Sequence, residues 1–168
     1  AVQFNKLIYQ RMMTGGKVTL FSPSDVPGLY DAFFADQSEF ERLYVQYEND
    51  DSIRKKSIEA MELFTLFMQE RASTGRIYLQ NVDHCNTHSP FDPNVAPVRQ
   101  SNLCLEIALP TKPLSHVNDE NGEVALCTLS AFNLGKIEHT DDLEELADLA
   151  VRALDSLLDY QDYPVPAA

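Results

Sequence analysis

The chain has 168 residues, enough for one ordinary domain, and its 26 acidic against 13 basic residues give a formal charge of −13. Because phosphate backbones are bound by clustered basic charge, this balance argues against a nucleic-acid-binding protein, although a nucleotide could still occupy a local pocket. The apolar runs fall far short of the roughly 20 residues that span a bilayer, no secretory signal opens the chain, and three scattered cysteines do not make a disulfide scaffold, so we expect a cytoplasmic protein.

The first half of the chain predicts helices around one short strand. Apolar residues recur at helical spacing in four segments, and Gly15-Gly16 and Gly75 lie where the first and last of these runs end. Capping side chains at 49–52 are expected to begin the longest of them. The expected helices cover 4–12, 26–34, 38–47 and 53–68, and the expected strand covers 18–21.

The second half predicts strands, a long loop and one long helix. A buried strand at 76–82 directly after a helix is typical of an α/β fold. The proline-rich stretch 83–99 is expected to be an irregular loop, and loops of that length inside a domain are usually functional. Further expected elements are strands at 103–107 and 124–130, a turn at 118–122 and an amphipathic helix at 141–158.

Three polar side chains alternate with apolar ones in the expected strand at 103–107. Asn102, Cys104 and Glu106 are two residues apart, so in an extended segment they would project to one side at about 7 Å per step. An amide, a thiol and a carboxylate on one edge offer a hydrogen-bond donor, a sulfur and a base. Taken on periodicity alone, a solvated strand face with a small apolar cysteine is the simpler interpretation.

Two other features allow chemistry. His84, Cys85 and His88 have the spacing H-C-x-x-H, but a zinc site needs a fourth ligand that the sequence does not supply nearby, so local hydrogen bonding within the loop is the favoured interpretation. Cys127 lies in an expected apolar strand, where a buried and inert thiol is the ordinary outcome.

The run from Arg99 to Ile107, RQSNLCLEI, strongly resembles the active-site loop of the large catalytic subunit of class I ribonucleotide reductases, in particular the bacterial class Ia enzymes. The resemblance continues upstream through NVDHCN at 81–86. Downstream it covers 123–135, around ALCTLS, and reaches LDYQDYP at 158–164. It therefore extends over essentially the whole chain.

The resemblance implies a fold and a set of roles. Residues 1–168 would be the central part of a ten-stranded α/β barrel and an internal fragment of a longer subunit, with a finger loop at about 83–107 that carries the catalytic cysteine. Cys104 matches the cysteine that forms a thiyl radical and Glu106 the proton acceptor, while Asn102 matches an amide that acts as a proton acceptor or hydrogen-bonds the substrate. Cys127 matches one of two redox-active cysteines, whose partner lies outside this chain.

The resemblance also implies cofactors and partners. The substrate would be a ribonucleoside diphosphate and the product its 2′-deoxy form, made for DNA synthesis. The intact enzyme would depend on a di-iron tyrosyl radical in a small subunit, on ATP and deoxynucleotide effectors, on thioredoxin or glutaredoxin, and on a dimer of large subunits. This segment itself is expected to bind no cofactor and no metal, and to be inactive alone. The alternative is a non-catalytic acidic α/β interaction module.

Overall fold

The computed structural model describes all residues, 1–168, and divides into two compact units, Ala1–Thr111 and Lys112–Ala168. Short 3-10 turns lie at Pro23–Asp25, Leu134–Lys136 and Thr140–Asp142. The helices are α1 (Lys6–Met13), α2 (Leu29–Ala35), α3 (Gln37–Glu48), α4 (Ala60–Thr74), α5 (Val82–Thr87) and α6 (Leu143–Tyr160), and the strands are β1 (Val2–Phe4), β2 (Lys17–Phe21), β3 (Lys55–Glu59) and β4 (Leu79–Asn81).

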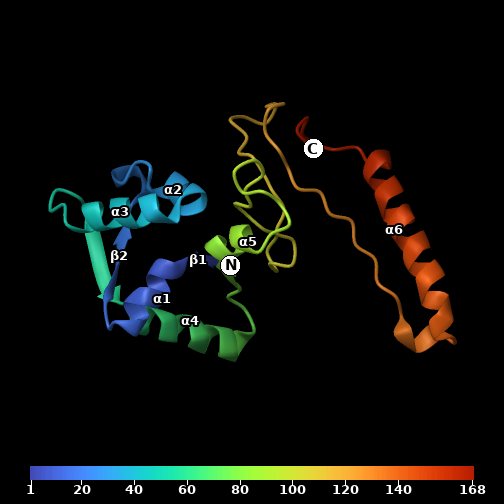
Figure 1. Ribbon diagram of the computed structural model, residues 1–168, viewed down its shortest axis with the longest axis horizontal. Helices are drawn as coiled ribbons and strands as arrows, with labels where there is room; N and C mark the ends of the chain where they lie inside the picture. The colour runs from blue at the N-terminus through green and yellow to red at the C-terminus, as the bar shows by residue number, and fades with distance from the viewer. The chain divides into compact units, whose positions relative to one another are not determined.

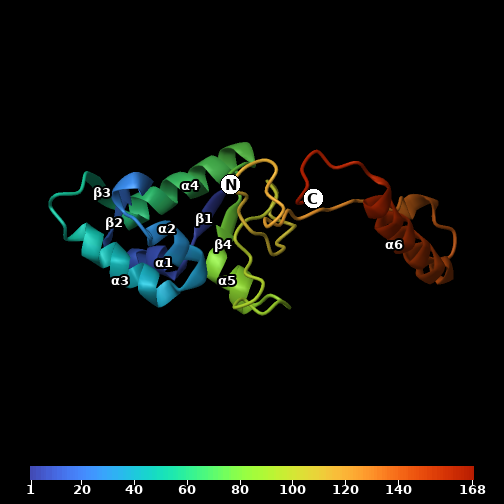
Figure 2. The same ribbon diagram turned by 90° about the horizontal axis from the view of Figure 1, so that it is seen from above.

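The strands of the first unit form two separate pairs, and Figure 1 labels one strand of each, β1 and β2. β1 pairs in parallel with β4, with Gln3 opposite Gln80, whereas β2 pairs antiparallel with β3. Figure 2 shows β1 beside β4, and β4 leads directly into α5. The unit is thus a mixed helix and strand structure, as an α/β class requires, and its strands do not close into a barrel.

Two of the expected helices begin later than predicted, because their first residues belong to strands. The expected helix at 53–68 starts only at Ala60, because residues 55–59 pair with β2 through backbone hydrogen bonds. The expected helix at 4–12 starts at Lys6, since residues 2–4 pair with β4. The strand at 18–21 and the two short helices after it are confirmed.

The core of the first unit lies between α2 and α3. The Asp36 carboxylate caps α3 by accepting hydrogen bonds from the backbone N–H groups of Ser38 and Glu39. Aromatic rings from both helices meet edge to face, as Phe33 does with Phe40. The buried residues of this cluster are Val26, Leu29, Ala32, Phe40 and Tyr44.

Tyr44 also closes the free edge of β2. Its hydroxyl accepts a hydrogen bond from the Thr19 N–H (2.6 Å) and donates one to the Thr19 carbonyl (2.8 Å). Both residues are buried, with exposures of 6% and 3%. Burial raises the pKa of Tyr44, so the phenol keeps the proton that it donates at neutral pH.

Tyr44→Phe is expected to lower the free energy of unfolding of the chain by about 2 kcal/mol. The substitution leaves a buried N–H and a buried carbonyl of Thr19 without partners, and each such group costs about 1–3 kcal/mol before the structure relaxes. Tyr47→Phe is the matched control, because the Tyr47 hydroxyl donates to the Pro27 carbonyl at the surface. Urea unfolding followed by circular dichroism measures both variants, and equal losses would contradict the role given to Tyr44.

The middle of the chain departs from the expected strands. The expected loop at 83–99 begins with the short helix α5. Residues 103–107 and 124–130 form no strand, because neither segment pairs with another. A segment with alternating apolar residues forms a strand only where a neighbouring segment pairs with its backbone N–H and C=O groups. Both segments are therefore irregular.

The second unit combines a turn with a long helix. The expected turn at 118–122 is confirmed by the isolated bridge between Lys112 and Glu123. Hydrogen bonds from the Ser115 hydroxyl and N–H, and then from the Asn121 N–H, lower the pKa of Asp119 to about 2. At a pH above the ordinary pKa of an aspartate, near 4, the ionised Asp119 therefore stabilises the turn. This stabilisation is lost as the pH falls toward 2.

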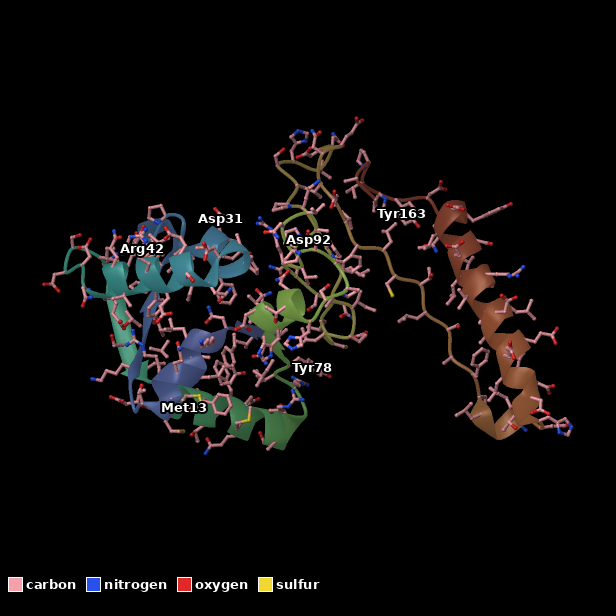
Figure 3. All side chains as sticks on the ribbon, in the orientation of Figure 1. Met13, Asp31, Arg42, Tyr78, Asp92 and Tyr163 are labelled. Carbon is pink, nitrogen blue, oxygen red and sulfur yellow. The ribbon has the colours of Figure 1, made fainter.

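The expected helix at 141–158 is confirmed as α6, which begins two residues later. Figure 1 shows an extended segment running alongside it, and the Thr128 hydroxyl donates to the Leu154 carbonyl there (3.3 Å). The Tyr163 hydroxyl, labelled in Figure 3, donates to the Leu158 carbonyl (2.7 Å) after the helix ends. No helix of the chain has the length and apolar character needed to cross a membrane.

Candidate active site

Cys104 lies at the tip of a small closed loop in the first unit. The Leu105 N–H donates to the Asn102 carbonyl (3.2 Å), which makes a tight turn around the cysteine. The Ile107 N–H donates to the Asn102 side-chain oxygen (3.1 Å), and the Asn102 N–H donates to the Ile107 carbonyl (3.4 Å). The Asn102 side chain thus fastens the two ends of the loop together.

This geometry corrects the expected alternation at 103–107. Leu105 has a φ of 68°, in the left-handed region that leucine rarely occupies, so the segment is a turn and not an extended strand. Leu103, expected on an apolar face, is 72% exposed. The even 7 Å spacing of an extended segment therefore does not apply to the three candidate side chains, which are carried by a turn instead.

The three candidate side chains differ in how they are held. The Cys104 thiol and the Glu106 side chain are exposed, and Asn102 is half-buried. The hydrogen bonds that close the loop use the Asn102 carboxamide oxygen and leave the Glu106 carboxylate free of them. The arrangement therefore presents a thiol and a carboxylate to solvent from a fixed turn, with the amide oxygen used in the turn itself.

The base of this loop is tied to the rest of the unit. The Arg99 guanidinium lies 4.0 Å from the Asp31 carboxylate of α2 and over the Phe34 ring. Asp31 is labelled in Figure 3. The Gln100 amide donates to the Tyr30 hydroxyl (3.4 Å). These contacts join residues 99 and 100 to α2.

Two further residues hold the base, and the sequence interpretation does not single them out. Asn86 of α5 hydrogen-bonds both backbone groups of Val98, and Gln3 of β1 donates to the Arg99 carbonyl. Asn86 lies within the NVDHCN run, but no motif in the sequence marks it as a contact of the loop. The hydrogen bonds of Asn86 with Val98, 12 positions away, and of Gln3 with Arg99, 96 positions away, are visible only in the structure.

Cys127 lies in the second unit. It is exposed and outside any strand, which corrects the expectation of a buried thiol in an apolar strand. Its sulfur has one contact within hydrogen-bond range, at 4.0 Å from the Thr128 carbonyl. An exposed thiol on an irregular segment is accessible to a redox partner.

The H-C-x-x-H residues make local contacts, as favoured from sequence. Cys85 is half-buried, and the Gln80 amide donates to its sulfur (3.4 Å). The rings of His84 and His88 meet edge to face with centroids 5.3 Å apart, and His88 shares a hydrogen bond with the Thr87 hydroxyl. Nowhere in residues 1–168 do three His, Cys, Asp or Glu side chains gather so that they could hold a metal ion.

Comparison with known proteins defines the class of this chain. The family model described as "Ribonucleotide reductase, barrel domain" matches residues 1–168. The chain therefore belongs to the ribonucleotide reductase barrel-domain family, and the resemblance drawn from the sequence is confirmed.

Particular relatives are similar along the whole chain. It is 79% identical over 167 residues to the ribonucleoside-diphosphate reductase subunit alpha of Haemophilus influenzae. It is 81% and 80% identical to the ribonucleoside-diphosphate reductase 1 subunit alpha of Salmonella typhimurium and of Escherichia coli. Each alignment covers 99% of this chain and 22% of the relative, so the chain spans about a fifth of the length of these proteins.

Proposed function

We propose that this chain is the cysteine-bearing segment of a ribonucleoside-diphosphate reductase alpha subunit, an oxidoreductase that converts ribonucleoside diphosphates to 2′-deoxyribonucleoside diphosphates. The observation that carries the proposal is an exposed thiol at the tip of a closed turn, with a carboxylate two residues later. This turn lies in a chain that is 79–81% identical to subunits of that name over 167 residues.

In this proposal, Cys104 begins the reaction as a thiyl radical. The sulfur takes the hydrogen atom from C3′ of the ribose, so an S–H bond forms, the C3′–H bond breaks and the radical moves to C3′. Sulfur suits this step because an S–H bond is comparable in strength to an activated ribose C–H bond. The same hydrogen returns to C3′ at the end, which regenerates the thiyl radical for the next cycle.

Glu106 and Asn102 act on the ribose around that radical. Glu106 accepts the proton of the 3′-hydroxyl, which eases loss of water from C2′, and its exposed side chain takes no part in the hydrogen bonds that close the loop. Asn102 orients the ribose through its amide N–H groups. This use is compatible with the turn, because the turn occupies the carboxamide oxygen of Asn102.

Cys127 supplies reducing equivalents in the proposal. Together with a second cysteine outside this chain, it gives up two hydrogen atoms, so that one C2′ hydroxyl leaves as water, the product gains a C2′–H bond and the two sulfurs become a disulfide. An external dithiol must then reduce that disulfide by thiol–disulfide exchange. The exposure of Cys127 favours such exchange.

The remaining parts of the proposal concern the intact subunit and its partners. The oxidising equivalent that forms the thiyl radical comes from a small subunit with a di-iron tyrosyl radical. Thioredoxin or glutaredoxin is the reductant, ATP and deoxynucleotides are effectors, and large subunits form a homodimer in the cytoplasm. Residues 1–168 contribute to a ten-stranded barrel whose finger loop covers about 83–107.

The test is a segment exchange. This chain replaces the matching segment of the Escherichia coli subunit alpha, to which it is 80% identical, and the chimera is assayed with the small subunit and a dithiol reductant. Formation of deoxyribonucleoside diphosphate at a rate within about tenfold of the parent is expected. A folded chimera that binds the small subunit and reduces no substrate would overturn the proposal and favour a non-catalytic interaction module.

A further inference from the structure

The loop that presents Cys104 leaves the rest of the first unit at Val98, and that point is fixed by one amide. The Asn86 carboxamide oxygen accepts the Val98 N–H (2.8 Å), and its NH₂ donates to the Val98 carbonyl (2.9 Å). The same NH₂ donates to the Val82 carbonyl at the start of α5 (3.0 Å). One side chain therefore bonds both backbone groups of Val98, as a neighbouring strand would, and also bonds its own helix.

The surroundings of Asn86 make these hydrogen bonds costly to lose. Val82 and Val98 are both fully buried, at 0% exposure, and no other residues of the chain have larger completely buried side chains. A buried backbone group that has no hydrogen-bond partner destabilises the folded chain. The Asn86 side chain thus pairs with the backbone of Val98, which has no neighbouring strand to pair with.

A second amide holds the next residue. The Gln3 side chain donates to the Arg99 carbonyl (2.8 Å) and to the Gln80 side-chain oxygen (2.9 Å), and Gln80 is only 5% exposed. Gln3 and Gln80 are register partners in the parallel β1–β4 pair. Consecutive residues at the base of the loop are therefore fastened to α5 on one side and to the sheet on the other.

We propose that Asn86 is a positioning residue for Cys104, with Gln3 as its support. The inference rests on the proposed function. Val98 and Arg99 are held by the two amides, and the cysteine follows five residues later on a turn that is itself closed by hydrogen bonds. Because the turn joins the rest of the unit through this base, the position of the sulfur relative to a bound ribose depends on Asn86. A misplacement of about 1 Å lowers the rate of a positioned reaction by about 10²-fold.

The test uses the chimeric subunit described above with Asn86→Ala, assayed with unlabelled and 3′-deuterated substrate. We expect kcat to fall at least tenfold and the deuterium isotope effect on kcat to rise, because slower transfer of the C3′ hydrogen controls more of the rate. A merely structural role would reduce the amount of active enzyme and leave the isotope effect unchanged. Amide exchange measured by mass spectrometry should rise in peptides that cover 98–107 and not in β1 or β4.

Asn94→Ala is the matched control. Asn94 lies between α5 and Val98, but its side chain bonds only the carboxylate of Asp92, which is labelled in Figure 3. Its kcat and isotope effect should equal those of the unsubstituted chimera. Asn86→Asp keeps the size and the acceptor for the Val98 N–H and loses both donated bonds, so it is expected to lower kcat and raise the isotope effect as well.

The outcomes separate the two proposals. An inactive unsubstituted chimera counts against the proposed function itself. An active chimera whose isotope effect is unchanged by Asn86→Ala overturns the positioning role, whatever the loss in kcat. If Asn86→Ala does not fold, Asn86→Asp decides in the same way: a kcat within twofold of the unsubstituted chimera, or an unchanged isotope effect, overturns the inference.

Discussion

Cys104→Ser is expected to abolish reduction of ribonucleoside diphosphates by the chimeric subunit. Serine keeps the size of the side chain, and the turn that holds residue 104 is closed by Asn102, Leu105 and Ile107, so the substitution leaves the loop intact. The O–H bond of serine is far stronger than the S–H bond of cysteine. A hydroxyl therefore cannot carry the radical that removes the C3′ hydrogen, and the first bond-breaking step does not occur.

Product formation and substrate affinity are measured together for this variant. Product should fall below detection, while equilibrium dialysis gives a substrate Kd within about threefold of the unsubstituted chimera. Cys85→Ser is the matched control, since Cys85 is half-buried on α5 and is assigned no reaction step. It should retain activity within about threefold. Turnover by Cys104→Ser at the unsubstituted rate would remove Cys104 from the mechanism.

Glu106→Gln is expected to lower kcat by about 10²–10⁴-fold, the usual contribution of a positioned general base. Glutamine has nearly the same shape and still accepts a hydrogen bond, but at neutral pH it cannot take up the proton of the 3′-hydroxyl. The Glu106 side chain is exposed, and the loop-closing hydrogen bonds do not use it, so the substitution should not disturb the turn.

Steady-state kinetics and thermal unfolding distinguish this loss from a folding defect. Glu106→Gln should unfold at the same temperature as the unsubstituted chimera, and Glu106→Asp, which keeps a carboxylate on a shorter side chain, should recover part of the rate. Glu41→Gln is the control, because Glu41 is an exposed carboxylate on α3, away from the loop. A kcat for Glu106→Gln equal to that of Glu41→Gln would refute the role of Glu106 as base.

The helices are the part of the fold that local sequence predicts well. α3 and α6 repeat their apolar residues at helical spacing, and each turn of a helix satisfies its own backbone, so the pattern and the structure coincide. Strands depend on a partner elsewhere. β1 pairs with β4, which lies 77 positions later in the chain. Residues 55–59, expected to be helical, form β3 because they pair with β2.

The candidate site divides in the same way. The run RQSNLCLEI is enough to single out Cys104, Glu106 and Asn102, because its resemblance to a known active-site loop needs no knowledge of the fold. The expected alternation along that run is nevertheless wrong. Without a partner strand, the Asn102 side chain bonds back to Ile107 and the segment turns on itself.

The sequence by itself determined the family, the identity of the candidate side chains and helices such as α3 and α6, since each of these depends on residues close together along the chain. Only the tertiary structure decided how the thiol is presented and what holds it. Asn86 and Gln3 reach the base of the Cys104 loop from 12 and 96 positions away. Hydrogen bonds between such distant residues leave no spacing in the sequence, because they exist only once the sheet and α5 have brought their partners together.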